Sequence, residues 1–201
     1  MLRESDIIQA RISPAEMAYL RRCAERAEIG GRSHIRGADR QDKLRQDQLT
    51  GMLGHYAAIR ELFGNPWLFR LQRHFANTYP LDSDGGSDLP GARLDVKSSL
   101  LTKPNMLDYR LPVRPRELHS SMNYLLALIR LEPEPTAFLV GWCSASMLPR
   151  QTETSGPFAG AHVIRASELN PLMKLGWFDE ARPPTKQQAG PLELNADAIR
   201  W

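Results

Sequence analysis

The chain has 201 residues, of which 42% are hydrophobic and 24% are charged, and its formal net charge is +3. This composition is ordinary for a globular protein with a real core, and its mild basic excess permits a nucleic-acid partner. The N-terminus lacks the apolar region of a signal peptide, and the longest apolar runs are too short to cross a bilayer. Cys23 and Cys143 form no CxxC motif, which argues against structural zinc and favours reduced thiols.

A first helix is predicted over residues 13–29, where apolar side chains recur at helical spacing. Ser13 is a suitable N-cap, and Glu16 completes a capping box with it. Residues 30–47 are polar and rich in arginine. Two interpretations stay open for this segment: a solvated loop or marginal helix, or an arm that contacts phosphates.

A second and stronger helix is predicted over residues 48–64, which carry a continuous apolar stripe and end at Gly64. Gly51 and Gly54 lower helix propensity, so we expect them to mark a close approach to another backbone, such as that of a sheet. Residues 66–79 are consistent with either another helix or an irregular packing segment.

A run of strands follows the helices. Residues 93–101 alternate like a strand, and residues 107–113 are predicted to pair with them after the loop TKPN. Residues 122–131 fit a buried helix or a buried strand, whereas residues 136–148 have the β-branched and aromatic content of a strand. We favour a hairpin of these two segments across EPEP, followed by a short strand within residues 157–165. The order of elements predicts an α+β fold with a mixed or antiparallel sheet.

The segment DSDGGSDLPGARLDVKSS contains the residues that best indicate chemistry. On a strand, Asp95 and Lys97 point to one face, and their neighbours Leu94 and Val96 point to the other. If LPGA turns the chain back, Asp88 comes beside Asp95.

Two carboxylates at one point repel each other, and a divalent cation with oxygen ligands, Mg²⁺ or Mn²⁺, would relieve that repulsion. Such an ion polarises a phosphodiester and lowers the pKa of bound water, and a neighbouring lysine orients that water or stabilises charge on phosphorus. Asp88, Asp95 and Lys97 are therefore the residue types that metal-assisted phosphodiester hydrolysis needs.

The pattern Asp88 followed by Asp95-x-Lys97 resembles the PD-(D/E)xK nuclease superfamily, including small nuclease-like proteins of phages and bacteria. The resemblance covers roughly residues 48–148. It implies a restriction-endonuclease-like core, α/β/α-like, with a mixed central sheet flanked by helices. With that core at residues 48–181, the remaining segments are an N-terminal helical arm at 1–47 and a tail at 182–201.

The resemblance also implies further site residues. The carbonyl of Val96 is a candidate metal ligand. These families often carry an acid on the helix before the sheet, but His55 stands at that position, so His55 itself, Glu61 or no residue supplies the third ligand. Ser98 is a further second-rank candidate. The candidates for phosphate contact are Arg93, Lys103 and Arg110.

The sequence thus predicts a metal-dependent nuclease that acts on nucleic acid, DNA rather than RNA, in the cytoplasm of a bacterial or phage-infected cell. Nucleases of this kind often work as homodimers. The alternative is a catalytically inactive nuclease-like module that binds nucleic acid or a protein partner. The histidine at position 55 favours that alternative, and the Asp88, Asp95 and Lys97 set argues against it.

Overall fold

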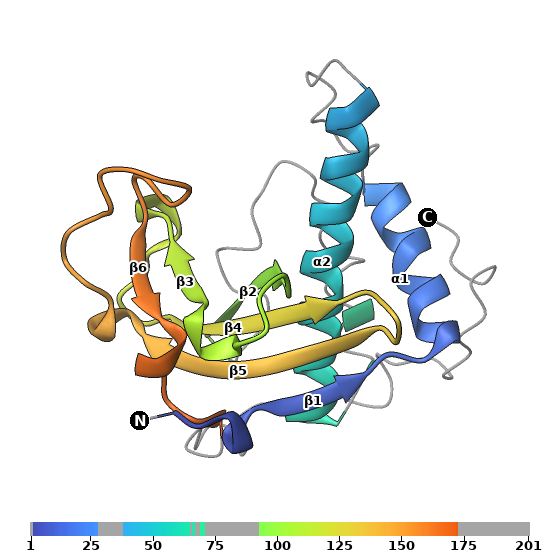
Figure 1. Ribbon diagram of the computed structural model, residues 1–201, viewed down its shortest axis with the longest axis horizontal. Helices are drawn as coiled ribbons and strands as arrows, with labels where there is room; N and C mark the ends of the chain where they lie inside the picture. The colour runs from blue at the N-terminus through green and yellow to red at the C-terminus, as the bar shows by residue number, and fades with distance from the viewer. Residues whose placement is uncertain (1, 28–37, 65, 67–68, 71–92, 173–201) are drawn as a thin grey trace, which may run out of the picture.

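The computed structural model describes residues 2–27, 38–64, 66, 69–70 and 93–172 (Figure 1). The protein is of the α+β class, as predicted, with a mixed four-stranded sheet, a two-stranded sheet and two helices in this part of the chain. The elements are β1 (Ile8–Arg11), α1 (Pro14–Ala27), α2 (Ala38–Phe63), β2 (Leu94–Leu100), β3 (Arg110–Val113), β4 (Asn123–Arg130), β5 (Thr136–Ser144) and β6 (His162–Arg165).

Helix α1 begins with the capping box that the sequence predicts. The backbone N–H of Glu16 donates to Ser13 Oγ at 3.3 Å, and the N–H of Ser13 donates to Glu16 Oε2 at 2.7 Å. These bonds satisfy donors that the first helical turn leaves without intrahelical partners. The first helix prediction is therefore confirmed in both its position and its cap.

The capping carboxylate of Glu16 also connects α1 to α2. Its Oε1 atom accepts hydrogen bonds from Tyr56 Oη at 2.8 Å and from the Arg60 guanidinium at 2.7 Å. Burial alone would raise the pKa of Glu16, but the hydrogen bonds from Ser13, Arg60 and Tyr56 outweigh it and lower that pKa. Glu16 therefore stays ionised between the two helices.

Substituting Glu16→Gln is expected to lower the free energy of unfolding by about 1–3 kcal/mol near neutral pH, because charged hydrogen bonds are lost. Since the folded state lowers the pKa of Glu16, its stabilisation is present above the ordinary glutamate pKa and is lost as the pH falls through the folded value. Urea unfolding at neutral and acidic pH should show the difference between the variant and wild type shrinking in acid. The exposed Glu25→Gln on α1 is the control, and an equal loss there would contradict the assignment.

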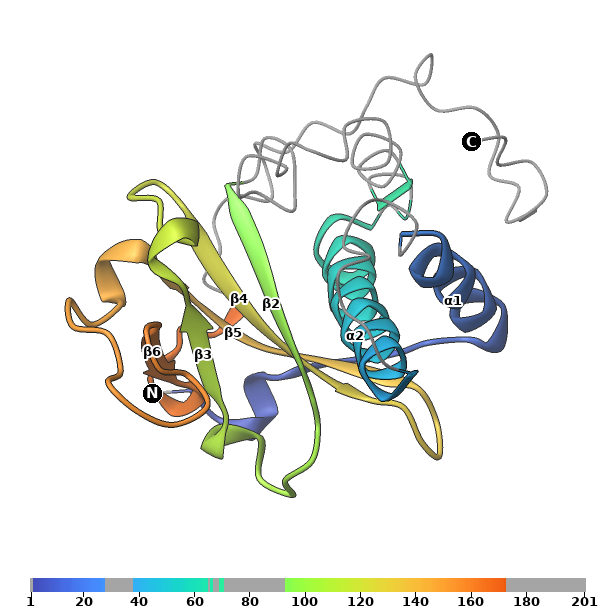
Figure 2. The ribbon, with the colours of Figure 1, turned by 90° about the horizontal axis from the view of Figure 1, so that it is seen from above.

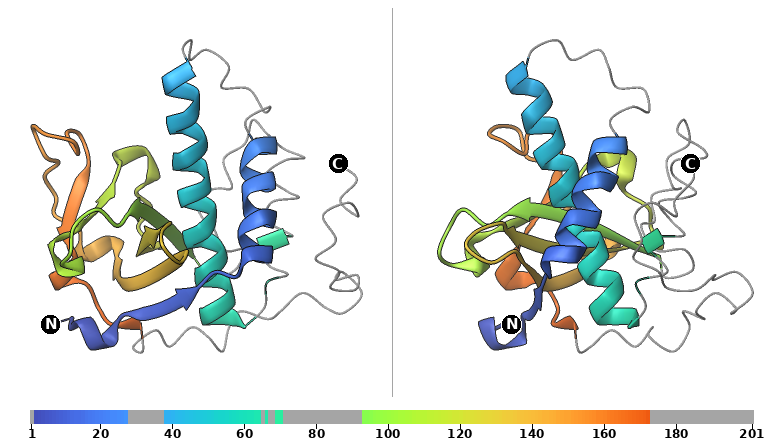
Figure 3. Two further views of the ribbon diagram at one scale, coloured as in Figure 1. Left: turned by 45° about the vertical axis from the view of Figure 1, so that its right-hand side comes forward. Right: turned by 90° about the vertical axis from the view of Figure 1, so that its right-hand side faces the viewer.

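Helix α2 is longer than the predicted 48–64 and begins at Ala38, so residues 38–47 are helix rather than loop, and their contact with phosphates stays a prediction. Its N-terminal half projects beyond the sheet (Figures 1 and 3). It ends before Gly64, which has a φ of +64° as a helix-terminating glycine should. Residues 66–79 lie almost entirely outside the described residues.

The two glycines inside α2 differ in their surroundings. A Cβ atom on Gly54 would lie 2.1 Å from Ser98 Oγ and 2.9 Å from Ala127 Cβ, so the predicted close approach to the sheet is confirmed there. At Gly51 a Cβ atom would meet nothing within 4 Å, so the same prediction is wrong for that residue. Gly54 is thus the point at which α2 contacts β2 and β4.

The central sheet has the strand order β1-β5-β4-β2. Strands β4 and β5 form the antiparallel hairpin predicted across EPEP, and β1 pairs antiparallel with the outer side of β5. Strand β2 pairs in parallel with β4, with Asp95 opposite Tyr124. The N-terminal 47 residues, expected as a helical arm, thus contribute both a strand of the sheet and the start of α2.

The predicted pairing of residues 93–101 with 107–113 is wrong. Strand β3 pairs instead with β6 in a separate antiparallel sheet. Strand β3 has only four residues and contains Pro112, which has no N–H to donate, so it is a poor partner for a seven-residue strand. The eight-residue β4, whose six central residues are all buried, provides β2 with a longer and more apolar neighbour.

The described residues form successive layers: α1, α2, the central sheet, and the β3–β6 sheet (Figure 2). One hydrophobic core lies between the helices and the central sheet, and a second lies on the sheet's other face. In this part of the chain both α-helices lie on the same face of the central sheet. The other face is covered by the β3–β6 sheet, whereas an α/β/α-like core was expected to have helices on both faces. No helix in the described residues is long and apolar enough to cross a membrane.

Candidate functional site: an ion-pair triad on β2

Strand β2 places its side chains as the alternation predicts. Leu94 and Val96 are buried in the core beneath α2. Asp95 and Lys97 point to the opposite face, where Asp95 Oδ2 and Lys97 Nζ are 2.8 Å apart. The side chain of Asp95 is only 9% exposed. A charged group this buried needs a compensating partner, and the lysine two residues along the strand provides it.

A second carboxylate binds the same ammonium group. Glu117 Oε2 lies 2.8 Å from Lys97 Nζ, so Lys97 is held between Asp95 and Glu117. The exposed fractions of the side chains are 9% for Asp95, 21% for Lys97 and 29% for Glu117. We call these three residues the triad. It runs from the protein interior to the surface and carries one net negative charge when all three groups are ionised.

The triad sets the protonation states of Lys97 and Glu117. Burial alone would lower the pKa of Lys97, but the charges and hydrogen bonds of Asp95 and Glu117 raise it above its ordinary value. Burial would raise the pKa of Glu117, but Lys97 outweighs it and lowers that pKa. Both groups are therefore charged at neutral pH. Lys97 can donate hydrogen bonds and stabilise negative charge there, but it cannot accept a proton.

The parallel pairing of β2 and β4 explains how Glu117 reaches Lys97. Parallel strands need a connection that returns the chain to the end of the sheet where the first strand began. Residues 101–122 make this return, and the 3-10 turn Pro115–Glu117 comes just before β4. Glu117 therefore arrives beside the first residues of β2. If β2 had paired with β3, as the sequence predicted, nothing would bring Glu117 to the start of β2.

Tyr124 fixes the turn that carries Glu117. It is the residue on β4 opposite Asp95, and it is fully buried. Its hydroxyl donates to the Glu117 carbonyl at 2.8 Å and accepts from the His119 N–H at 2.9 Å. The rigid Tyr124 side chain, which is anchored in the sheet, thus fixes the position of the 3-10 turn relative to β2.

The second-rank candidates lie on the α2 side of the sheet, away from the triad. Ser98 Oγ is buried against Gly54 with no hydrogen-bond partner among the described residues. His55 packs edge-to-face against Phe69, with ring centroids 5.6 Å apart. Glu61 is exposed and pairs with Arg60 at 2.7 Å. The structure does not bring these three side chains together with Asp95 and Lys97.

The predicted phosphate contacts are distributed around β2 and β3. Arg93 is exposed directly before β2, with the unusual φ of +48° for a residue other than glycine. Lys103 is exposed, with its ammonium 5.8 Å from the centroid of the Tyr109 ring. Arg110 pairs with Glu153 at 2.6 Å and lies over the Phe158 ring. Arg110 is thus the most constrained of the three predicted contacts.

The predicted metal ligands are described only in part. Asp88 lies outside the described residues, and Val96, the proposed carbonyl donor, is in the β2–β4 ladder. No group of three or more His, Cys, Asp or Glu side chains in the described part of the chain is placed to hold a metal ion. Within the described residues, the carboxylates of Asp95 and Glu117 both bind the ammonium of Lys97.

Sequence reasoning missed Glu117. It is twenty residues from Lys97 and belongs to no short motif, and only the parallel pairing of β2 with β4 brings the two together.

Comparison of the chain with protein-family models, with curated proteins and with solved structures finds no match in any of the three.

Proposed function

We propose that this protein is a metal-dependent nuclease that hydrolyses phosphodiester bonds of nucleic acid, DNA rather than RNA. The observation that carries the proposal is the largely buried Asp95–Lys97 pair on one face of a strand that follows a helix. The proposal includes a restriction-endonuclease-like core built around α2 and the mixed sheet, and action as a homodimer. The buried thiols of Cys23 and Cys143 support a cytoplasmic location in a bacterial or phage-infected cell.

In this proposal, Asp95, Asp88 and the Val96 carbonyl would hold Mg²⁺ or Mn²⁺. Such an ion, when bound, polarises the phosphodiester and lowers the pKa of water. Lys97 remains protonated beside its carboxylates, so its role would be to donate a hydrogen bond to a negatively charged oxygen of the substrate. A thiol nucleophile is disfavoured, because burial raises the pKa of Cys143 to about 12.

A catalytically inactive module that binds nucleic acid or a protein partner is the second candidate. The triad itself favours it, since an ammonium neutralised by two carboxylates is also a common structural arrangement. The two candidates differ in one respect that can be measured. A nuclease needs the Lys97 charge for turnover, whereas an inactive module needs it only for folding.

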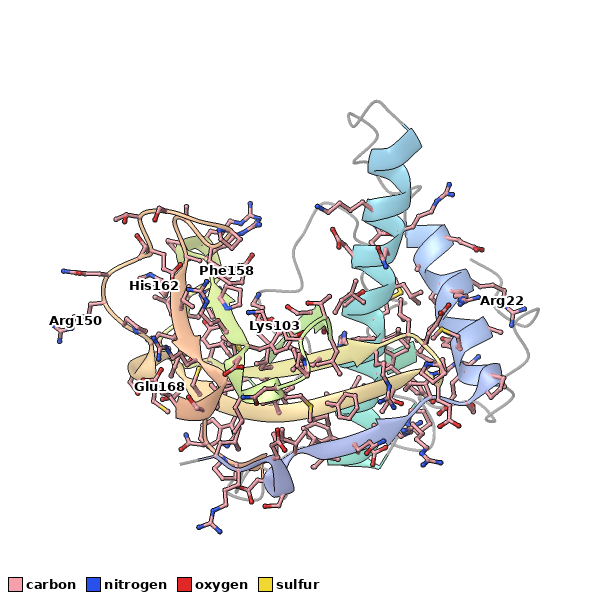
Figure 4. All side chains as sticks on the ribbon, viewed as in Figure 1. Arg22, Lys103, Arg150, Phe158, His162 and Glu168 are labelled. Atoms are coloured by element: carbon pink, nitrogen blue, oxygen red, sulfur yellow. The ribbon has the colours of Figure 1, made fainter. Side chains whose placement is uncertain are left out.

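The test is cleavage of linear, circular and single-stranded DNA and of RNA in the presence of Mg²⁺, Mn²⁺ or EDTA. We expect metal-dependent cleavage by the wild type and at least a roughly 100-fold loss in Lys97→Ala, because a charge aimed at the transition state is removed. Arg150→Ala, which removes an exposed cation from the loop before β6, is the matched control and should keep full activity (Figure 4).

Circular dichroism of each variant shows whether it has folded. The nuclease proposal is refuted by a folded wild type that cleaves none of the four substrates with either metal. It is equally refuted by a folded Lys97→Ala protein that cleaves as fast as the wild type.

A further inference from the structure

The triad continues to the protein surface as a line of alternating charges. Asp95 pairs with Lys97, Lys97 with Glu117, and Arg116 Nε lies 3.8 Å from Glu117 Oε1. The side chain of Arg116 is 70% exposed, so an isolated pair between Arg116 and Glu117 would contribute little. The bond from Glu117 to Lys97 is shorter and less exposed, which makes it the contact with the larger effect.

The fold holds the backbone of Glu117 in place. Its carbonyl accepts the hydroxyl hydrogen bond of the fully buried Tyr124, and Pro115 stands at the first position of its 3-10 turn. Both features restrict the backbone at this residue. The backbone from which the Glu117 carboxylate reaches Lys97 is therefore held in place.

Two fixed acceptors orient an ammonium group in a way that one cannot. Lys97 has three N–H donors, and Asp95 and Glu117 each lie at hydrogen-bond distance from its nitrogen. With only Asp95 present, the group could rotate about that single contact. With both carboxylates in place, two donors are committed, and the direction of the third is set.

We propose that Glu117 is a positioning residue, which holds the Lys97 ammonium against Asp95 and directs its remaining N–H to an anionic oxygen of a phosphodiester. The inference rests on the proposed nuclease function and adds to it a residue outside the Asp-x-Lys motif. Glu117 acts through Lys97 and makes no contact with the reacting atoms. Glu117 is also an acid that lies beside Lys97, whereas the acid position considered in the sequence analysis lies on α2.

The first measurement concerns the Lys97 amine and requires no activity. Nitrogen-15 relaxation of lysine ammonium groups gives the order parameter of the Lys97 amine in the wild type, in Glu117→Gln and in Glu117→Asp. We expect the amine to become more mobile in Glu117→Gln and to be partly restored in Glu117→Asp, which keeps the charge. The control Glu168→Gln alters a glutamate that also ends a three-residue 3-10 turn, near β6, and should change nothing (Figure 4).

The second measurement separates positioning from folding. Glu117→Gln should lower kcat roughly tenfold with little change in KM, because supporting residues of a reactive group have effects of about that size. In a Lys97→Met background the same substitution should have no further effect on any residual cleavage, since Glu117 acts only through Lys97. Thermal unfolding confirms that each variant is folded, which we expect because the Tyr124 bond uses the Glu117 backbone.

An unchanged Lys97 order parameter in Glu117→Gln would overturn the inference even if the wild type is an active nuclease. An unchanged kcat with a mobile amine would also overturn it. If the wild type cleaves nothing, the nuclease function and the positioning role both fail. The relaxation data would still decide whether Glu117 holds Lys97.

Discussion

Gly54→Ala should lower the free energy of unfolding by about 1–2 kcal/mol, although alanine is the better helix former. The change gains about 1 kcal/mol of helix propensity. Against this, the new Cβ atom would lie 2.9 Å from Ala127 Cβ and 2.1 Å from Ser98 Oγ, and overpacking typically costs about 1–3 kcal/mol. Rotation of the Ser98 hydroxyl relieves only part of its contact, and the Ala127 methyl group on β4 cannot move without its strand. The steric cost therefore exceeds the gain in propensity.

Gly51→Ala is the matched control, since it lies one turn earlier on the same helix in open space. It should stabilise the protein by up to about 1 kcal/mol, so the two substitutions are expected to have opposite signs. Urea unfolding monitored by circular dichroism measures both. Two stabilising substitutions would show that α2 does not approach β4 as closely as described.

The contributions of Ser98 and Ala127 to the close contact at position 54 can be measured separately. Ser98→Ala removes a buried oxygen that has no partner among the described residues, so by itself it should be neutral or slightly stabilising. Combined with Gly54→Ala, it should restore part of the lost stability, because the shorter of the two close contacts is gone.

Lys97→Met should lower the free energy of unfolding by about 2–4 kcal/mol near neutral pH. The substitution removes the cation that Asp95 and Glu117 both bind, and breaking an ion pair costs about 3–5 kcal/mol in fully buried sites. The triad is partly solvated at Glu117, which reduces the expected loss. Asp95 keeps its 9% exposure and would face Glu117 with no cation between them.

The pH dependence of this loss follows from Glu117. The folded state lowers the pKa of Glu117, so its stabilising interaction is present above the ordinary glutamate pKa and disappears as the pH falls through the folded value. The difference between Lys97→Met and wild type should therefore shrink in acid. Urea unfolding across the acidic range measures it, with Lys103→Met, an exposed lysine, as the control. Equal stability of Lys97→Met and wild type at neutral pH would show that the triad does not stabilise the fold.

The features that the sequence predicted correctly are local ones. The cap of α1 depends on Ser13 and Glu16, which are three residues apart, and the β4–β5 hairpin depends on the short turn EPEP. The shared face of Asp95 and Lys97 follows from the two-residue period of a strand. Each of these needs only neighbouring residues, so periodicity and turn chemistry suffice.

The features that the sequence did not predict depend on distant residues. Nothing in the alternation of β2 selects β4 rather than β3 as its partner, because strand period determines faces and not neighbours. Glu117 could not be assigned to the site without that partner. The four-residue β1 is too short for a periodic signal and is defined by its pairing with β5.

The strand order also bears on how the chain folds. Among the described strands of the central sheet, only β4 and β5 are joined by a tight turn, while residues 101–122 separate β2 from β4, and β1 pairs with β5 from near the start of the sequence. Contacts between distant segments form late, because closing long loops has an entropic cost. During synthesis, β2 would leave the ribosome before the strand it pairs with. The carboxylate of Glu117 would thus meet Lys97 only once β4 had been made and had paired with β2.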